Sequence, residues 1–424
     1  MKQINKPHIA SQEKVLLVVT RYKQDTHTWT LEDMSHEMKE LVNACSGEVV
    51  GEMQFQISKP SATNLIGDGR VKEISDQLSL LNADTIVFSH DLKGSQQRNI
   101  EDVLQVKTID RTQLILDIFA KHATSKAGKI QVELAQLGYL LPRLVGKGIE
   151  LSRLGGGIGT LGPGETKLEI DRRRIAQRID KLKKDLSTVV ANRSLNRKKR
   201  KKQGIAMISL VGYTNAGKST LLNTLTSAKQ VTRDGMFTTL DSLTRQFVLP
   251  NHQKTLLSDT VGFMNDLPHH LIEAFKATLE EVREADLLLH VIDMSAHNFR
   301  ALYESVNNVL GELKVLDKPV ILVFNKCDQK DDPEFIKSLI DGYEHSVCIS
   351  ALHGVRLDDL YHKIVRMLSN LYTEINAIVP INRMDLVNLA HEEGEVYSVK
   401  YYADTINIRA SVPNHLVAHF DKPS

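Results

Sequence analysis

Residues 205–225 read IAMISLVGYTNAGKSTLLNTL, and this stretch constrains the architecture more strongly than any other in the chain. The apolar run Ile205–Val211 leads into the loop Gly212–Ser219, and leucines then recur at helical spacing. The loop has the pattern GxxxxGK[ST] between a strand and a helix. Its glycines let backbone N–H groups close on phosphate oxygens, and the N-terminus of the following helix favours anions. The stretch therefore predicts a phosphate-binding loop in an α/β domain.

This loop supplies the first candidate site residues. Lys218 is placed to reach the β- and γ-phosphate oxygens, and it is a predicted catalytic residue because it would spread the charge that develops during hydrolysis. The Ser219 hydroxyl is a predicted Mg²⁺ ligand. The residues expected to bind the phosphates are Gly212, Tyr213, Thr214, Asn215, Ala216, Gly217, Lys218, Ser219 and Thr220.

The loop alone does not distinguish adenine from guanine, but a second motif does. The run Asn325-Lys326-Cys327-Asp328 begins 107 residues after Lys218 and directly follows an apolar strand, at the carboxyl end where open α/β sheets bind ligands. The Asp328 carboxylate accepts hydrogen bonds, so it matches guanine N1–H and the exocyclic amine, whereas adenine offers no such pair of donors. The sequence therefore predicts a GTP/GDP site whose base contacts come from Asn325, Lys326, Asp328, Ser350, Ala351 and Leu352.

Two further segments have the character of nucleotide-dependent switches. Asp259, Thr260, Val261 and Gly262 follow a strand, where the carboxylate would hold Mg²⁺ and the glycine N–H, a predicted catalytic group, would meet the γ-phosphate. Between this motif and the phosphate loop lies Phe237–Asp241, with two adjacent threonines. We predict Thr239 as a Mg²⁺ ligand and catalytic residue. Thr238 stays open as the alternative, because their order alone does not separate them.

Phe263 occupies the position after DxxG, where many GTPases have a glutamine that orients the attacking water. An aromatic side chain cannot hold that water. The hypothesis is slow intrinsic hydrolysis that a partner accelerates.

The residues before this domain predict two other regions. From Lys14 to Asp110, apolar runs alternate with helical patterns in the order β-α-β-α-β-α-β, which predicts a Rossmann-like parallel sheet in residues 1–111. The glycine-rich turn Gly67–Gly69 before a helix could hold a phosphate, but such a turn is usually only a turn, and no second nucleotide site is assigned.

Residues 112–203 are predicted to form a helical hairpin. Apolar positions from Ile115 to Leu141 recur at steps of three or four and predict one amphipathic helix that Pro142 ends. Gly146–Gly164 contains eight of the 24 glycines and is expected to be a long loop. A second helix follows from Leu168 to Val189. The charged, aperiodic run Arg193–Gln203 is interpreted as a domain boundary.

The predicted fold class is therefore α/β, with a P-loop GTPase domain in residues 204–373 and a small α+β domain in residues 374–424. The net charge of +2 conceals a basic segment, since Asp171–Lys202 holds 14 Lys or Arg against three Asp. Such a run is either a solvated helix surface or a patch for nucleic-acid phosphates.

Composition limits the compartment and class. The chain has 424 residues, and no apolar run reaches the roughly 18 that a membrane-spanning helix needs. Three cysteines cannot form a disulfide framework. We expect a multidomain, monomeric protein of the reducing cytoplasm, with peripheral membrane association left open. The adjacent His269 and His270 lack companion ligands at metal spacing and are interpreted as surface residues.

Taken together, these residues resemble the HflX family of ribosome-associated GTPases. The matching segments are Gln131–Leu137, Gly155–Thr160, Gly162–Glu169, Asp171–Arg174, Phe237–Asp241 and Asp259–Phe263 followed by Leu267-Pro268-His269. The family more often has alanine where this chain has Thr238, which favours Thr239 as the metal ligand. Departures are Arg70, where lysine is common, and Leu161, where a basic residue is expected.

The resemblance implies binding to the 50S subunit or the 70S ribosome, with the N-terminal part reaching ribosomal RNA near the peptidyl-transferase region. It also implies that the GTP state promotes ribosome dissociation or rescue of stalled ribosomes. The alternative is an RNA-binding or ribosome-assembly factor whose affinity is gated by guanine nucleotide, with negligible catalysis. An ATPase or phosphotransferase is disfavoured by Asn325 and Asp328.

Overall fold

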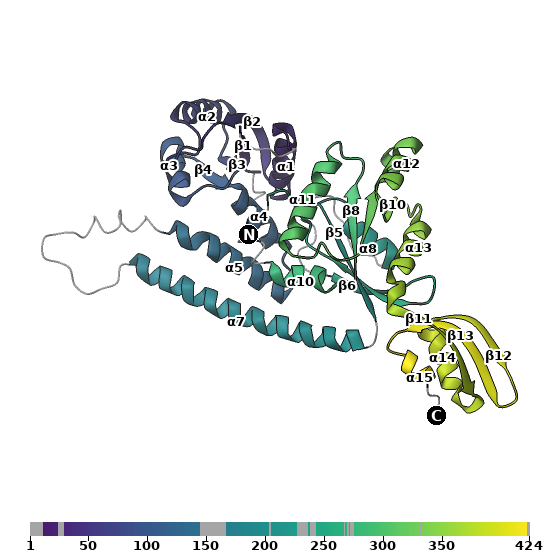
Figure 1. The fold of residues 1–424 in the computed structure, drawn as a ribbon. Coiled ribbons are helices and arrows are strands. Elements are labelled where there is room, and N and C mark those ends of the chain that lie inside the picture. Colours follow the sequence, from purple (N-terminus) through teal and green to yellow (C-terminus); the bar gives the residue numbers. More distant parts are fainter. Residues whose placement is uncertain are drawn as a thin grey trace, which may run out of the picture. The chain divides into compact units, whose positions relative to one another are not determined.

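The computed structural model describes residues 12–23, 29–144, 167–202, 205–226, 236–237, 243–266, 268, 271, 275–330 and 332–421. The chain divides into two compact units, Met1–Asp185 and Leu186–Ser424 (Figure 1). This division falls inside a helix, and the predicted division into four domains stays a prediction. No helix in the described part of the chain is both long and apolar enough to cross a membrane.

The first unit contains the predicted parallel sheet, in the strand order β2-β1-β3-β4. Helices α2 and α3 pack on one face of it through a shared apolar cluster, and Figure 1 shows α1 on the opposite side from α2. Its elements are β1 (Lys14–Tyr22), α1 (Leu31–Ala44), β2 (Glu48–Ile57), α2 (Asp68–Leu81), β3 (Thr85–Phe88), α3 (Gly94–Leu104), β4 (Lys107–Asp110), α4 (Arg111–His122) and α5 (Lys126–Arg143).

The prediction of one helix between Ile115 and Leu141 is wrong, because the chain forms two helices there, α4 and α5. Ala123 is extended, and the Ser125 hydroxyl accepts a hydrogen bond from the Gly128 N–H, as an N-cap does. Since the apolar spacing stays in phase across this break, periodicity alone did not reveal it. Pro142 lies inside α5, which ends at Arg143, one residue beyond the proline that was predicted to end it.

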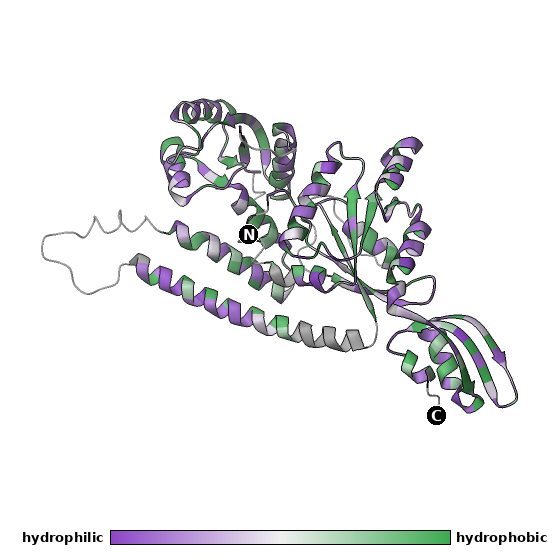
Figure 2. Cartoon of the chain, viewed as in Figure 1, coloured by the Kyte–Doolittle hydropathy of each residue, from purple (hydrophilic) through white to green (hydrophobic). Residues whose placement is uncertain are grey.

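Helix α7 (Lys167–Lys202) is longer than its apolar pattern predicts. Apolar spacing is lost after Val189, yet the backbone stays helical through most of the charged run that we interpreted as a boundary. Lysine and arginine have high intrinsic helix propensity, which explains a helix without an apolar stripe. Figure 2 shows the described part of α7 as mainly hydrophilic.

The second unit is built on a six-stranded sheet in the order β10-β9-β8-β5-β7-β6. All strands are parallel except β6, which pairs antiparallel with β7. Its elements are β5 (Ala206–Gly212), α8 (Lys218–Thr226), β6 (Leu243–Val248), β7 (Lys254–Asp259), α10 (Lys276–Glu284), β8 (Leu287–Asp293), α11 (Phe299–Glu312), β9 (Val320–Asn325), the 3₁₀ turn η1 (Cys327–Gln329), α12 (Pro333–Gly342), β10 (Ser346–Cys348), α13 (Leu357–Leu368) and η2 (Ser369–Leu371).

The central strands are buried on both faces, as parallel sheets between helices are. Every residue of β5 is buried, and Figure 2 shows the central strands as hydrophobic. Because β5, β7, β8, β9 and β10 run parallel, their carboxyl ends meet at one edge of the sheet. The loops that follow these strands carry the predicted site.

The remaining residues form a three-stranded antiparallel sheet in the order β11-β13-β12, covered by α14 through a separate apolar cluster. The elements are β11 (Tyr372–Pro380), η3 (Ile381–Arg383), α14 (Met384–Glu393), β12 (Glu395–Tyr401), β13 (Thr405–Pro413) and α15 (Val417–Asp421). Strand β11 begins two residues before the predicted start of this domain. The predicted fold class is thus confirmed.

Candidate nucleotide site

The phosphate-binding loop joins β5 to α8, and two of its glycines are required by the backbone. Gly212 has φ +151°, and a Cβ there would collide with the backbone oxygen of Val291 on β8. Gly217 has φ +93°, and a Cβ there would collide with the Asn325 side-chain amide. Positive φ and close approach by a neighbour are the conditions under which only glycine fits.

Lys218 lies at the centre of this loop and is buried. Its Nζ donates hydrogen bonds to the carbonyl oxygens of Gly212 at 3.0 Å and Tyr213 at 2.7 Å. Burial lowers the pKa of Lys218 to about 8, while the Asp259 carboxylate acts in the opposite direction. The loop therefore holds one desolvated amine where phosphate oxygens would gather.

Ser219 and Asp259 are brought together although 40 residues separate them. The Ser219 hydroxyl donates to Oδ2 of Asp259 at 2.6 Å. Asp259 is the last residue of β7, and only 1% of it is exposed. A hydroxyl and a carboxylate at this distance are the hard oxygen donors that Mg²⁺ prefers. Among described residues, no group of three or more His, Cys, Asp or Glu side chains forms a metal site.

The residues after Asp259 run beside the phosphate loop. Backbone hydrogen bonds join Thr214 N–H to the Phe263 carbonyl at 2.9 Å and Phe263 N–H to the Gly212 carbonyl at 3.1 Å. A Cβ at Gly262 would lie 3.1 Å from Lys218 Nζ. The Phe263 side chain is 2% exposed. The segment Asp259–Phe263 is thus tied to the phosphate loop, and the aromatic ring of Phe263 is packed inside the domain.

The remaining predicted residues of this segment face the protein. The Thr260 hydroxyl donates to the Leu210 carbonyl at 2.7 Å, and Val261 is buried. These two residues can reach a nucleotide only through their backbone. The Tyr213 hydroxyl accepts a hydrogen bond from Asn265 N–H at 2.8 Å, which is a further tie between the two segments.

Asn325 connects the phosphate loop to the residues that were predicted to contact the guanine base. We call the run Asn325–Asp328 the base motif. Its amide Nδ2 donates to the Ala216 carbonyl at 2.9 Å, and its Oδ1 accepts from Ala351 N–H at 2.9 Å. The side chain is buried at the end of β9. One side chain therefore holds together three segments that are 109 and 26 residues distant in sequence.

Lys326 and Asp328 extend the base motif along the edge of the sheet. Lys326 has φ +64° and pairs with Asp293, at the end of β8, with Nζ 2.6 Å from Oδ2. Asp328 Oδ2 lies 3.8 Å from His353 Nε2. Ser350 is buried, whereas the Leu352 side chain is 73% exposed. The structure thus brings together the described residues of both motifs.

Several predicted features lie outside the described residues. They are Thr239 and its alternative Thr238, His269 and His270, and the glycine-rich segment Gly146–Gly164.

Sequence reasoning missed two residues near the site, Asp293 and His290. The place of Asp293 at the carboxyl end of β8 was a usable signal. His290 sits inside β8, 1% exposed, and stacks on Tyr303 with ring centroids 5.3 Å apart. Burial and the charge of Lys218 lower its pKa to about 3. It is therefore a neutral imidazole beneath the phosphate loop, and nothing in its sequence context indicated this.

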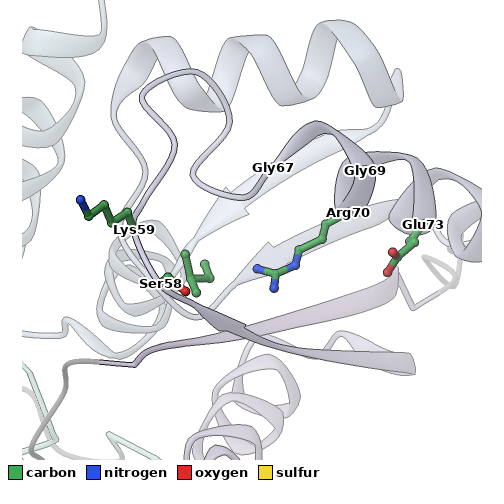
Figure 3. Close-up of a pocket in the computed structure, with 7 residues that line it drawn as sticks. Ser58, Lys59, Gly67, Gly69, Arg70 and Glu73 are labelled. Carbon is green, nitrogen blue, oxygen red and sulfur yellow. The ribbon is translucent and has the colours of Figure 1, made fainter.

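A hollow lies in the first unit, with a volume of about 620 Å³. Its lining comes from Ile57, Ser58, Lys59, Gly67, Gly69, Arg70 and Glu73 (Figure 3). The Arg70 side chain points toward the end of β2, where its Nη2 donates to the Gln56 carbonyl at 2.8 Å, and its guanidinium lies over the Phe55 ring. The Arg70 guanidinium is thus engaged by the domain itself, and we assign no second nucleotide site.

Three family models match the chain. Residues 32–120 match "GTP-binding GTPase N-terminal", residues 122–200 match "GTP-binding GTPase Middle Region", and residues 207–326 match "50S ribosome-binding GTPase". A GTPase HflX from Caldanaerobacter subterraneus subsp. tengcongensis is 44% identical over 381 residues, which cover 90% of this chain and 88% of that protein.

The chain belongs to the HflX family of GTPases. The GTPase HflX of Escherichia coli strain K12 is 40% identical over 361 residues, which cover 84% of this chain and 83% of that one. A solved GTP-binding protein of Sulfolobus solfataricus in complex with GDP is 25% identical, covers 85% of this chain and 100% of its own, and aligns with a TM-score of 0.43. Membership of the HflX family makes this protein a GTP-binding enzyme that hydrolyses GTP.

Proposed function

We propose that this HflX-family protein is a GTP-driven switch that binds the 50S subunit and the 70S ribosome and promotes ribosome dissociation or rescue of stalled ribosomes. The observation that carries the proposal is the buried Phe263 at the position of the water-orienting residue. A site that lacks a polar group for the attacking water suits an enzyme whose hydrolysis depends on a partner. The family model matched by residues 207–326, described as ribosome-binding, supports the ribosome as that partner.

We assign the nucleotide contacts by segment. The phosphates would lie on the loop from Gly212 to Thr220, against its N–H groups and Lys218. The base would lie against Asn325, Lys326, Asp328 and the segment Ser350–Leu352. Two arrangements described above support this: Asn325 joins the two motifs, and Gly262 approaches Lys218 closely enough that its N–H would reach the same phosphate.

Ser219 and Asp259 fit a Mg²⁺ ion, directly or through water, because their oxygens lie 2.6 Å apart at the end of β7. Thr239, outside the described residues, is the proposed third ligand. When bound, the ion would neutralise charge on the β- and γ-phosphates.

The chain's own groups would perform the remaining work. Lys218 would exchange its bonds to the two loop carbonyls for phosphate oxygens, and the buried position would strengthen each new bond. Gly262 N–H would donate to the γ-phosphate. Because the Phe263 backbone is hydrogen-bonded to Gly212 and Thr214, movement of the segment Asp259–Phe263 would be transmitted to the phosphate loop.

The exposed basic residues of α7 are the proposed anchor on ribosomal RNA near the peptidyl-transferase region. Arg172, Arg173, Arg174, Lys181, Lys183 and Lys184 are exposed, and A-form RNA presents phosphates and 2′-hydroxyls to such surfaces. With six to ten phosphate contacts, affinity should fall on the order of 10³- to 10⁵-fold between 50 and 200 mM salt. A ribosome affinity that does not change with salt concentration would contradict this anchor.

Single-turnover GTP hydrolysis with and without ribosomes tests the proposal. We expect ribosomes to raise the rate by on the order of 10³- to 10⁵-fold, as partners do for other GTPases. An unchanged rate would instead favour an RNA-binding or assembly factor for which the nucleotide only gates affinity. Sedimentation of ribosomal particles with GDP, GTP or a non-hydrolysable analogue would then separate dissociation of the subunits from simple binding.

A further inference from the structure

Two of the three cysteines lie beside the base motif. Cys327 is the residue between Lys326 and Asp328, and Cys348 is the last residue of β10. Strands β9 and β10 pair in parallel with Cys348 opposite Phe324. The Cys327 N–H then donates to the Ile349 carbonyl at 3.1 Å. The two cysteines are therefore on adjacent, hydrogen-bonded chain segments.

Both thiols face the same apolar cluster. Cys348 is 2% exposed and belongs to a cluster with Phe299, Phe324 and Leu339, and partly buried Cys327 packs against that cluster. Burial raises the pKa of Cys348 to about 11, and the neighbouring Cys327 thiol acts in the same direction. Burial, and after it the Asp328 carboxylate, raise the pKa of Cys327 as well, and the Arg356 guanidinium only partly opposes the rise at both thiols. The two thiols thus lie in or against one apolar cluster, with Arg356 near enough to affect both.

We propose that Cys327 and Cys348 form a peroxide-sensitive thiol pair whose oxidation to a disulfide weakens guanine-nucleotide binding. This inference rests on the proposed base site. The oxidant is hydrogen peroxide or an organic hydroperoxide. A thiol pair that cycles between the two states is the form in which disulfides occur in reducing compartments.

The reaction balances as follows. The more accessible Cys327, as thiolate, attacks one peroxide oxygen; the O–O bond breaks, and the sulfur becomes a sulfenic acid. Cys348, as thiolate, then attacks that sulfur, the S–S bond forms, and hydroxide leaves and takes up a proton. With hydrogen peroxide, two thiols lose two electrons and two protons in total, and the peroxide becomes two waters.

The disulfide would act on the base site through its neighbours. Cys327 lies between the two residues proposed to contact guanine, Lys326 and Asp328. Cys348 precedes Ile349, whose N–H and carbonyl bond to Phe324 and Cys327. Joining the sulfurs would draw the Asp328 loop toward β10 and move its carboxylate from the guanine edge. Loss of hydrogen bonds to a charged acceptor weakens binding by about 10- to 100-fold.

The experiment uses the full chain. GDP affinity is measured by calorimetry on reduced protein, again after hydrogen peroxide that is then removed with catalase, and a third time after dithiothreitol. We expect a mass loss of two hydrogens, a linked peptide pair containing Cys327 and Cys348, affinity lower by about 10- to 100-fold, and full recovery on reduction.

Two variants provide matched controls. Cys348→Ala keeps Cys327 but cannot form the disulfide. After peroxide treatment, this variant should not show the loss of GDP affinity that the parent shows and that dithiothreitol reverses. Cys45→Ala removes a thiol of the first unit and should respond as the parent does. A peroxide dose that oxidises Cys45 but leaves no link between the other two, or a link without change in affinity, would overturn the thiol pair. Reduced protein that binds no GDP would instead overturn the base site itself.

Discussion

At the scale of single residues, the phosphate loop and the base motif depend on one another through Asn325. Its amide satisfies a carbonyl of the loop and an N–H of the segment after β10 at once. Gly217 is the residue that makes room for this amide. Nucleotide binding should therefore be sensitive to small changes at the contact between Gly217 and Asn325, although neither motif predicts this contact.

Gly217→Ala tests this dependence. The added methyl collides with the Asn325 amide, and alanine is strained at φ +93°. We expect GDP affinity to fall by about 10- to 100-fold with an unchanged far-UV circular dichroism spectrum. The matched control is Gly138→Ala in α5, where an added Cβ meets nothing within 4 Å. That variant should bind GDP normally, and equal binding by both variants would contradict the argument.

His290 makes the free energy of unfolding depend on pH. Its pKa is lowered to about 3 by burial and by Lys218, against 6.5 for an exposed histidine. Between pH 6.5 and pH 3, the unfolded chain therefore binds a proton at His290 that the folded chain does not bind. The contribution to stability is fully present above pH 6.5 and is lost as the pH falls toward 3.

The variant His290→Met removes this pH-dependent contribution to the free energy of unfolding. Between pH 7 and pH 5 the unfolding free energy of the parent should fall by about 2 kcal/mol more than that of the variant. Hydrogen exchange of β5 and β8 in a urea series would measure it. His362→Met, at an exposed position of α13, should follow the parent. Parallel pH profiles for the parent and His290→Met would show that the imidazole does not stay neutral.

At the scale of elements, an ion pair with a fully buried carboxylate fixes the end of α5 in the first unit. Arg143 Nη2 donates to Asp110 Oδ2 at 2.8 Å and to the Leu92 carbonyl at 2.6 Å. The Asp110 side chain is fully buried, and burial raises its pKa despite the neighbouring guanidinium. Removing one partner of such a pair leaves an uncompensated buried group.

We predict that Arg143→Met lowers the unfolding free energy of the first unit by about 3 kcal/mol. Trp29, buried in that unit, provides a fluorescence signal for urea denaturation. The control is Arg178→Met, because the Arg178–Glu133 pair is exposed on both sides. Exposed pairs contribute little, so the control should denature like the parent. A similar urea midpoint for both variants would count against the buried pair.

The sequence predicted those elements whose pattern is local. The buried strands of the two parallel sheets and the helix after the phosphate loop were readable from apolar runs and spacing. The strands β6 and β11 were missed. Strand β6 has six residues and buries only one of them, so its pattern is weak. Strand β11 alternates the buried Ile375, Ala377 and Val379 with exposed residues, which was a usable signal. The break between α4 and α5 was missed because a cap, and not the apolar spacing, determines it. In the site, the motif residues were readable, but the bridge from Asn325 and the stacked His290 depend on tertiary contacts.

At the scale of the whole molecule, each unit has its own apolar clusters. Because every described residue proposed to bind the nucleotide lies after residue 204, a fragment of residues 204–424 should fold and bind GDP within about threefold of the full chain, a difference under 1 kcal/mol. Calorimetry checks this, with the fragment 1–203 as the control that should bind none. Failure of the fragment to bind would mean that the first unit contributes to the site.

Helix α7 has a mechanical consequence. Its 36 residues contain no glycine or proline, so it lacks the usual sites at which helices kink, and at 1.5 Å per residue it is about 54 Å long. A flexible linker with the same number of residues would extend when one end is pulled and would transmit little force. A continuous helix extends far less, so a force or rotation applied near Lys167 would be transmitted along α7 to Lys202.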